Sequence, residues 1–131
     1  MIAGQLAELL GAKQVSVNAD ILAAYRFDRW CLKHWQDWRG EALDAPACVV
    51  RPRDSAEVQA VVRFAAEHNV AIVPWGLGSG VCGGIEPQPD QILIDMSAMN
   101  RVLSIDEENL LLTVEAGING LVAEEAVAAR G

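Results

Sequence analysis

Two segments at the start of the chain carry apolar residues at the spacing of a helix. Residues 2–11 predict a first helix, which Gly11 is suited to end. Residues 18–27 predict a second helix, with Asn18 as its N-terminal cap. We expect both helices to serve as packing elements, the second one through the inward-facing side chains of Ile21, Leu22 and Tyr25.

The next periodic region predicts a strand, a helix and a second strand. Residues 47–50 and 70–73 are short apolar runs, each typical of a buried strand. Between them, Asp54 and Glu57 have the spacing of a capping box, and Asn69 is suited to the left-handed residue that ends a helix. Strands joined by a crossover helix run parallel in one sheet. The helix would bury one apolar face, made of Val58, Val61, Val62, Ala65 and Ala66.

Shorter elements follow in the last third of the chain. Residues 92–95 predict a third buried strand. Residues 102–105 and 110–114 predict a hairpin, closed by the polar turn at 106–109. Residues 119–130 predict a final helix. A parallel unit followed by a hairpin indicates an α+β fold, with a βαβ unit, then mixed strands and a helix.

Residues 26–45 are unusually dense in aromatic and charged residues. Trp30, Trp35 and Trp38, three of the four Trp residues, lie here among arginines and aspartates. Because exposed Trp and Arg favour interfaces, one interpretation is a segment that faces a substrate or partner. We prefer the other interpretation, a loop whose Trp side chains cover an edge of the domain, because Trp is usually largely buried.

Composition narrows the function classes. The chain has 131 residues, 52% of them hydrophobic and 21% charged, which is enough to bury a core. The formal net charge of -8 argues against nucleic acid or an anionic membrane surface as the main partner. No apolar run is long enough to cross a membrane, and no signal peptide is recognised.

The residues that form disulfides and metal sites are few and scattered. The three cysteines, Cys31, Cys48 and Cys82, form no C-x-x-C motif and are odd in number. Their spacing favours a reducing compartment, and we expect the protein to be cytoplasmic. The two histidines, His34 and His68, are too few for a metal site.

Residues 74–84, Pro-Trp-Gly-Leu-Gly-Ser-Gly-Val-Cys-Gly-Gly, carry the densest chemical signal in the chain. Five of these residues are glycine, and the segment directly follows a predicted strand. Glycine allows a positive φ and a close approach to a ligand, and successive N–H groups in such a bend form an anion-binding concavity. The segment contains no Lys or Arg, so backbone amides, with the Ser79 hydroxyl, would hold the anion.

Two familiar phosphate-binding templates do not fit this segment. A dinucleotide fingerprint that begins at Gly76 would need glycine at position 81, where Val81 stands. A P-loop needs a Lys before Ser or Thr, and the segment has none. A glycine-rich connection without a ligand remains the alternative when the segment is considered alone.

The order of several segments resembles one known family. These are Val49–Pro52, Ile72–Gly80, Ile92–Val102 and Val114–Ile118. Together they are similar to the N-terminal half of the FAD-binding domain of the vanillyl-alcohol oxidase/p-cresol methylhydroxylase (PCMH) superfamily. Within it, the likeness is greatest to the group that contains glycolate oxidase and D-lactate dehydrogenase. The alkyl-dihydroxyacetonephosphate synthase branch is almost as similar around Met99–Arg101.

The resemblance covers about residues 45–131 and implies a domain plan. Residues 1–45 would be an N-terminal helical segment and Trp-rich loop. Residues 46–131 would be the N-terminal subdomain of a PCMH-type FAD-binding domain, incomplete at its C-terminal side. A second flavin half and a substrate-binding cap would then lie outside this sequence, and this chain alone would be inactive.

The resemblance also implies which residues hold the cofactor. In that family the bend wraps the FAD diphosphate with backbone amides. Covalently flavinylated relatives carry a His near position 79, where this chain has Ser79, so non-covalent FAD is expected. No catalytic residue is expected within the 131 residues, and Asp95, Asp106, Glu115 and Glu124 are interpreted as structural or solvated charges. The cofactor-binding residues would be Trp75, Gly76, Leu77, Gly78, Ser79, Gly80 and Gly83.

Three functions follow from the resemblance as alternatives. The first is the FAD-binding part of an oxidoreductase that oxidises a small D-2-hydroxy acid of the glycolate or D-lactate type. The second is an FAD-dependent transferase of the alkyl-dihydroxyacetonephosphate synthase type. The third is a non-catalytic fragment that associates with itself or pairs with a missing C-terminal part.

Overall fold

A four-stranded mixed sheet organises the first hundred residues. The computed structural model describes all residues, 1–131. The strand order is β1-β2-β4-β3, with β2, β3 and β4 parallel and β1 antiparallel to β2. The predicted βαβ unit is therefore present, although β4 lies between its two strands. The bounds are β1 Val15–Ser16, β2 Cys48–Val50, β3 Ile72–Trp75 and β4 Ile92–Asp95.

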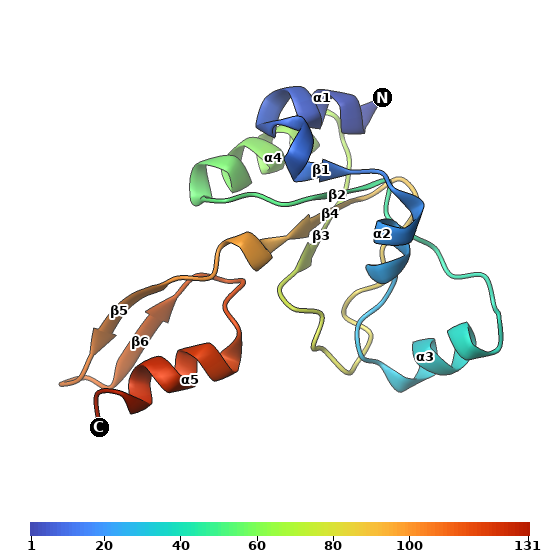
Figure 1. The fold of residues 1–131 in the computed structure, drawn as a ribbon. Helices are drawn as coiled ribbons and strands as arrows, with labels where there is room; N and C mark the ends of the chain where they lie inside the picture. Colours follow the sequence, from blue (N-terminus) through green and yellow to red (C-terminus); the bar gives the residue numbers. More distant parts are fainter.

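Two helices, α1 (Ile2–Leu10) and α4 (Ser55–Glu67), pack on one face of this sheet (Figure 1). Their buried side chains join alternate residues of β2 and β4 in one core, as the two-residue repeat of a strand requires. The core residues are Leu6, Leu10, Cys48, Val50, Val61, Phe64, Ala65, Ile92 and Ile94. The first helix is thus a packing element, as its spacing predicts.

Short-range sequence signals set several of the boundaries. Asn18 accepts hydrogen bonds from the N–H groups of Asp20 and Ile21 at 3.0 and 3.2 Å, and caps α2 (Ala19–Ala24). Asp54 accepts from the Glu57 N–H at 2.9 Å and caps α4. Asn69 follows α4 with a φ of 53°, the left-handed conformation expected of it. These caps confirm the predicted starts and the end of α4.

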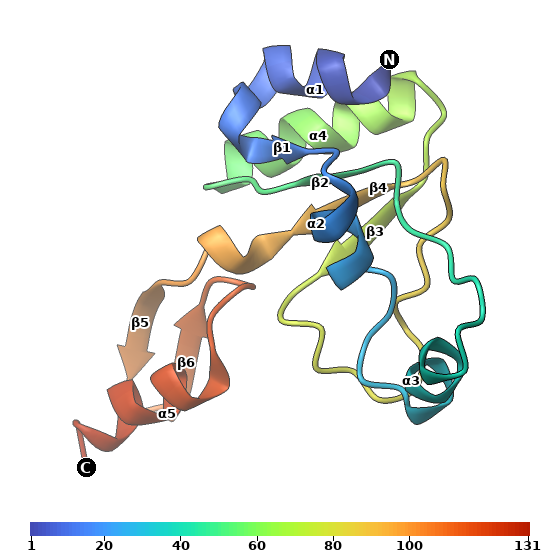
Figure 2. The same ribbon diagram turned by 45° about the vertical axis from the view of Figure 1, so that its right-hand side comes forward.

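A hairpin and a helix form a separate region at the end of the chain. Strands β5 (Val102–Asp106) and β6 (Leu111–Val114) pair antiparallel, and α5 (Gly120–Ala128) lies beside them. Figures 1 and 2 show this region, in orange and red, standing away from the four-stranded sheet. The predicted hairpin and final helix are confirmed, and so is the α+β class.

One ion pair joins the residue before β5 to the residue after β6, at the open end of the hairpin. Arg101 bonds Glu115 at 2.6 Å, and Glu115 is only 7% exposed. The Glu115 carboxylate also accepts the Arg101 N–H at 2.8 Å. Glu115 thus has the structural role assigned to it from the sequence.

The Trp-rich segment differs from the prediction. Residues 26–45 contain a helix, α3 (Cys31–Trp38), instead of a continuous loop. Trp35 is 49% and Trp38 82% exposed, so these two rings do not cover an edge of the domain. The apolar residues Leu32, Trp35 and Trp38 do recur at helical spacing, but α3 buries none of its residues against the core. Trp30, by contrast, is half-buried beside Gly83.

Other predicted faces need smaller corrections. Ile21 is 42% exposed, not inward-facing, and Val62 of α4 is 48% exposed, whereas Phe64 is buried. Strand β3 is only half-buried because it lies at the edge of the sheet. Strand β1 has two residues, too few for a periodic signal, so the sequence pattern does not predict it.

Only one of the three cysteines, Cys48, is buried, whereas Cys31 and Cys82 are exposed. All three cysteines are free, and burial raises the pKa of the Cys48 thiol to about 11. His68 ends α4 and stacks on Phe64, with ring centroids 4.0 Å apart. No helix has the length and apolar character needed to cross a bilayer.

Candidate functional site

The glycine-rich bend begins where β3 ends, at the carboxyl ends of the parallel strands. Trp75 is the last residue of β3 and pairs with Asp95, the last residue of β4. In open parallel sheets, ligands bind outside this edge. All seven predicted cofactor-binding residues therefore lie in one continuous segment, 75–83, at the edge where a ligand is expected.

The backbone amides of the bend are available to a ligand. None of the N–H groups from Gly76 to Gly83 donates a hydrogen bond within the protein, and the first one that does is that of Gly84. Most residues of the bend are exposed, so water can satisfy these donors until a ligand replaces it. A run of free amides in a glycine-rich bend is suited to an anion.

The local shape of the bend requires glycine at position 78. Gly78 has a φ of 64°, in the left-handed region. A Cβ at this position would also lie 2.2 Å from the Trp75 ring. The Trp75 ring in turn meets Tyr25 edge-on, with centroids 4.8 Å apart. The Trp75 ring, packed against Tyr25, thus fills the space that a side chain at 78 would need.

The far side of the bend is attached to a segment that precedes the first parallel strand. The Arg29 N–H donates to the Gly80 carbonyl at 2.8 Å. The Asp28 carboxylate accepts from the Gly84 N–H at 3.0 Å and from the Trp30 N–H at 2.9 Å. Residues 28–30 therefore hold the bend from outside the strand–helix–strand unit.

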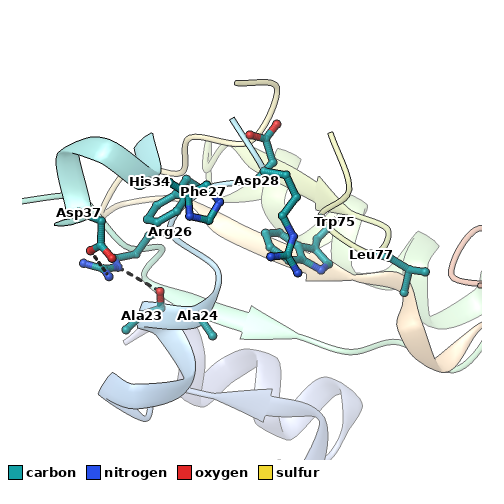
Figure 3. Close-up of a pocket in the computed structure, with 11 residues that line it drawn as sticks. Ala23, Ala24, Arg26, Phe27, Asp28, His34, Asp37, Trp75 and Leu77 are labelled. Atoms are coloured by element: carbon teal, nitrogen blue, oxygen red, sulfur yellow. Dashed lines mark hydrogen bonds and ion pairs between the residues drawn. The ribbon is translucent and has the colours of Figure 1, made fainter. Parts of the chain in front are cut away.

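A cavity of about 300 Å³ lies between this segment and the bend. Figure 3 shows Trp75 and Leu77 on one side, and Phe27 and His34 on the other. Arg26 closes the far wall through an ion pair with Asp37 at 2.8 Å. The full lining is Ala23, Ala24, Arg26, Phe27, Asp28, Arg29, His34, Asp37, Trp75, Leu77 and Gly78.

A second cavity, of about 370 Å³, lies toward the hairpin region. Leu77 lines both cavities, so the bend separates them. Asn119, which caps α5 by accepting the Leu121 N–H at 2.9 Å, is part of this lining. The lining comprises Leu77, Ser97, Asn100, Gly117, Ile118, Asn119 and Val122. An elongated ligand could thus contact the bend from either side.

Three polar side chains join α2 to the same edge of the sheet. The Tyr25 hydroxyl and the Arg51 Nε each donate to Asp95 Oδ2 at 2.7 Å, and Arg51 also bonds the Tyr25 oxygen at 2.9 Å. Burial alone would raise the pKa of Asp95, which is 1% exposed. The donors Ser97, Tyr25 and Arg51 outweigh it and hold that pKa below its ordinary value. Asp95 is therefore a structural carboxylate.

Three residues at this site are not predicted as site residues by the sequence. Its pattern indicates a packing role for Tyr25 and assigns no individual role to Asp28 and Arg29 of the Trp-rich segment. The available signal is the density of charged and aromatic residues after position 25. The helix of this segment buries no residue in the core, and Asp28 and Arg29 meet the distant bend instead.

Comparison with known proteins identifies similar sequences. A family profile described as an FAD binding domain matches residues 46–131. The glycolate oxidase protein GlcD of Bacillus subtilis is 38% identical over 86 residues, 66% of this chain and 18% of that protein. The alkyldihydroxyacetonephosphate synthase of Trypanosoma brucei brucei is 30% identical over 132 residues, 97% of this chain and 22% of that protein.

A third relative is the mitochondrial D-2-hydroxyglutarate dehydrogenase of Arabidopsis thaliana. It is 30% identical over 110 residues, which is 84% of this chain and 18% of that protein. The chain thus spans about a fifth of the length of the curated relatives it matches.

Solved structures of other proteins share this fold. An alkyldihydroxyacetonephosphate synthase matches with a TM-score of 0.87 and 27% identity, over 99% of this chain and 25% of that one. A p-cresol methylhydroxylase matches with a TM-score of 0.78 and 24% identity, over 98% of this chain and 24% of that one. The second likeness concerns the fold alone.

Proposed function

The chain belongs to the FAD-binding domain family that its residues 46–131 match, and from this premise we propose how it uses the cofactor. The bend at 75–83 holds the diphosphate of non-covalently bound FAD. The complete protein is an oxidoreductase that acts on a small D-2-hydroxy acid. The observation that carries the first statement is the run of free amides from Gly76 to Gly83.

The residues present suit the diphosphate. Amide donors to a charged acceptor are each worth about 1.5–3 kcal/mol, so a few of them together can hold a dianion. The chain carries a net charge of -8, which makes local dipoles more important for capturing an anion. Ser79 contributes a hydroxyl group to the bend. Because it is not a histidine, it cannot form the covalent bond that joins His to the flavin in covalent flavoproteins.

When bound, FAD supplies the hydride acceptor, and the protein orients it. The contribution of this chain is to bind and position the cofactor. The bend would hold the diphosphate, and the two cavities beside Leu77 offer room for the groups on either side of it. No residue of the 131 is proposed as a catalytic acid or base.

The substrate class is supported by two of the relatives. One is named as part of glycolate oxidase and another as a D-2-hydroxyglutarate dehydrogenase, and both names refer to 2-hydroxy acids. A D-2-hydroxy acid is therefore the substrate class we propose for the complete protein.

One observation favours a second candidate. The match to alkyldihydroxyacetonephosphate synthase extends over 97% of the chain, and a solved synthase has a higher TM-score, 0.87, than the p-cresol methylhydroxylase, 0.78. A transferase of that type, which uses FAD without net oxidation of its substrate, is the alternative.

Anaerobic mixing of the FAD-loaded complete protein with glycolate, D-lactate or D-2-hydroxyglutarate separates the two candidates. We expect one of these acids to bleach the oxidised-flavin absorbance; if it is one of the chiral acids, its L-form should leave the absorbance unchanged. If none of the three acids bleaches the flavin, the oxidoreductase proposal is wrong. Exchange of an acyl group for a fatty alcohol would then support the transferase.

A further inference from the structure

Asp28 is a buried carboxylate with no basic partner. It is 2% exposed and forms none of the seven ion pairs of the chain. Two backbone N–H groups, of Trp30 and Gly84, are its only hydrogen-bond donors. Burying a charge without a counter-ion is costly, and two amide bonds offset that cost only if both are kept. The Asp28 carboxylate therefore depends on the bend for one of its two donors, and the Gly84 N–H of the bend depends on Asp28 for its acceptor.

The residues around Asp28 meet the bend at three points. Arg29 donates its N–H to the Gly80 carbonyl at 2.8 Å. The Trp30 ring lies so close to Gly83 that a Cβ there would be 2.5 Å from it. Asp28 itself bonds the N–H of Gly84. These contacts fix residues 80–84, which contain no helix or strand.

Gly80 is the point of closest approach between the two segments. A Cβ at Gly80 would lie 2.8 Å from Asp28 Oδ2. No unusual backbone angle is involved, since Gly80 is not among the glycines with positive φ. Position 80 therefore requires glycine because a side chain there would collide with the Asp28 carboxylate, and not because the backbone needs a positive φ.

On the proposed function, we infer that Asp28 is a positioning residue of the FAD site. Its carboxylate accepts a hydrogen bond from the Gly84 N–H, and the adjoining Arg29 N–H donates one to the Gly80 carbonyl. The N–H groups from Gly76 to Gly83 are then held in a fixed bend, and none of them donates a hydrogen bond within the protein. Asp28 lies outside residues 46–131, so the matched family domain does not include it.

The physical benefit is preorganisation. Glycine has the greatest backbone freedom of any residue, and a free glycine-rich loop loses that freedom when it binds a ligand. Contacts that order the loop beforehand remove this cost from the binding step. Loss of Asp28 should therefore weaken FAD binding more than it affects folding.

The test is FAD titration of the complete apoprotein, followed by quenching of flavin fluorescence. In Asp28→Ala the dissociation constant for FAD should rise about tenfold or more. Asp28→Asn keeps one acceptor oxygen and should give an intermediate constant, with a thermal midpoint close to that of the unaltered protein. Asp44→Asn removes the same charge from an exposed position in the same N-terminal part and should bind FAD normally. Unchanged FAD binding in both Asp28 variants would overturn the inference.

A double-mutant cycle separates positioning from general destabilisation. Gly80→Ala should weaken FAD binding in the unaltered protein, because its methyl group displaces the Asp28 carboxylate. In the Asp28→Ala background the same change should add little, since the space is then open. Full additivity of the two effects would contradict the proposed coupling.

A third pair of variants distinguishes failure of this inference from failure of the proposed function. Gly78→Ala strains the bend itself, whereas a Cβ at Gly4, in α1, meets nothing within 4 Å, which makes Gly4→Ala its control. If Gly78→Ala leaves FAD binding unchanged, the bend does not hold the cofactor, and both proposals are wrong. If it weakens binding while the Asp28 variants do not, only the positioning role is wrong.

Discussion

Arg29 differs from most basic residues of the chain because its charge is not neutralised within the protein. Seven of the ten Lys and Arg side chains form ion pairs, and Arg29 is not among them. It lines the same cavity as Trp75, Leu77 and Gly78. In a chain with a net charge of -8, an unpaired guanidinium beside an anion site is available to the ligand.

We predict that Arg29→Ala weakens FAD binding by about fivefold at low salt, roughly the value of one exposed charge pair. The difference should shrink as salt rises, because screening weakens exposed pairs. Arg63 also forms no ion pair but lies on α4 and lines neither cavity, so Arg63→Ala is the control. Dissociation constants measured at several salt concentrations check the prediction. Equal effects of the two substitutions would contradict it.

Among the elements, the contact of α2 with the sheet decides where the bend begins. The hydrogen bonds of Tyr25 and Arg51 to Asp95 tie the ends of α2 and β2 to the end of β4. Tyr25 also packs edge-on against Trp75 at the start of the bend. A change at Asp95 should therefore alter the stability of this whole edge of the sheet.

We predict that Asp95→Asn lowers the free energy of unfolding by about 2–3 kcal/mol at neutral pH, a range that allows for the half-exposed Arg51. The pKa of Asp95 is lowered in the folded state, so its contribution is present above the unfolded pKa of about 4. That contribution is lost as the pH falls through the folded value. Urea unfolding at several pH values should therefore show the two proteins converging in acid.

The control for this series is Asp90→Asn, at an exposed position without a hydrogen-bonded side chain. It should follow the unaltered protein at every pH. Parallel loss of stability in Asp95→Asn and the unaltered protein would show that Asp95 does not contribute in the way described.

In the whole molecule, the hairpin region presents apolar side chains that the rest of the chain leaves more than half exposed. Leu103, Leu110, Leu111 and Leu121 are 56%, 88%, 62% and 62% exposed. Figure 2 shows β5, β6 and α5 away from the helices that cover the sheet. Clusters of exposed leucine commonly mark surfaces that associate.

We predict that residues 1–131, prepared as an isolated chain, associate through the hairpin region in a concentration-dependent manner. Replacing both Leu103 and Leu111 with Ser should shift the chain toward the monomer in sedimentation experiments. Val17→Ser removes a side chain that is 61% exposed outside the hairpin region and should have no such effect. A monomer at every concentration before substitution would contradict the prediction.

Much of the fold could be predicted from local patterns. The caps at Asn18 and Asp54 and the left-handed Asn69 depend on groups within a few residues of one another. The exposure of α3 could not be predicted, because Leu32, Trp35 and Trp38 recur at the spacing of a packed helix and yet none of them is buried. The half-buried state of β3 could not be predicted either, since it depends on β4 lying between β2 and β3. The domain boundary near residue 45 and the seven cofactor-binding residues stay predictions, although α1 and β1 already share the core and sheet of the later residues.

The sequence by itself determined the order of elements, the position of the bend and its lack of a basic residue, and through them the FAD-binding family. These features depend on residue type and short spacing, which are properties of the sequence and do not depend on the tertiary structure. Only the tertiary structure decided that Asp28 meets Gly84, 56 positions later, and that Arg29 reaches the cavity beside Gly78. Contacts of this kind have no periodic trace in the sequence, because they exist only after the sheet brings separate segments to one edge.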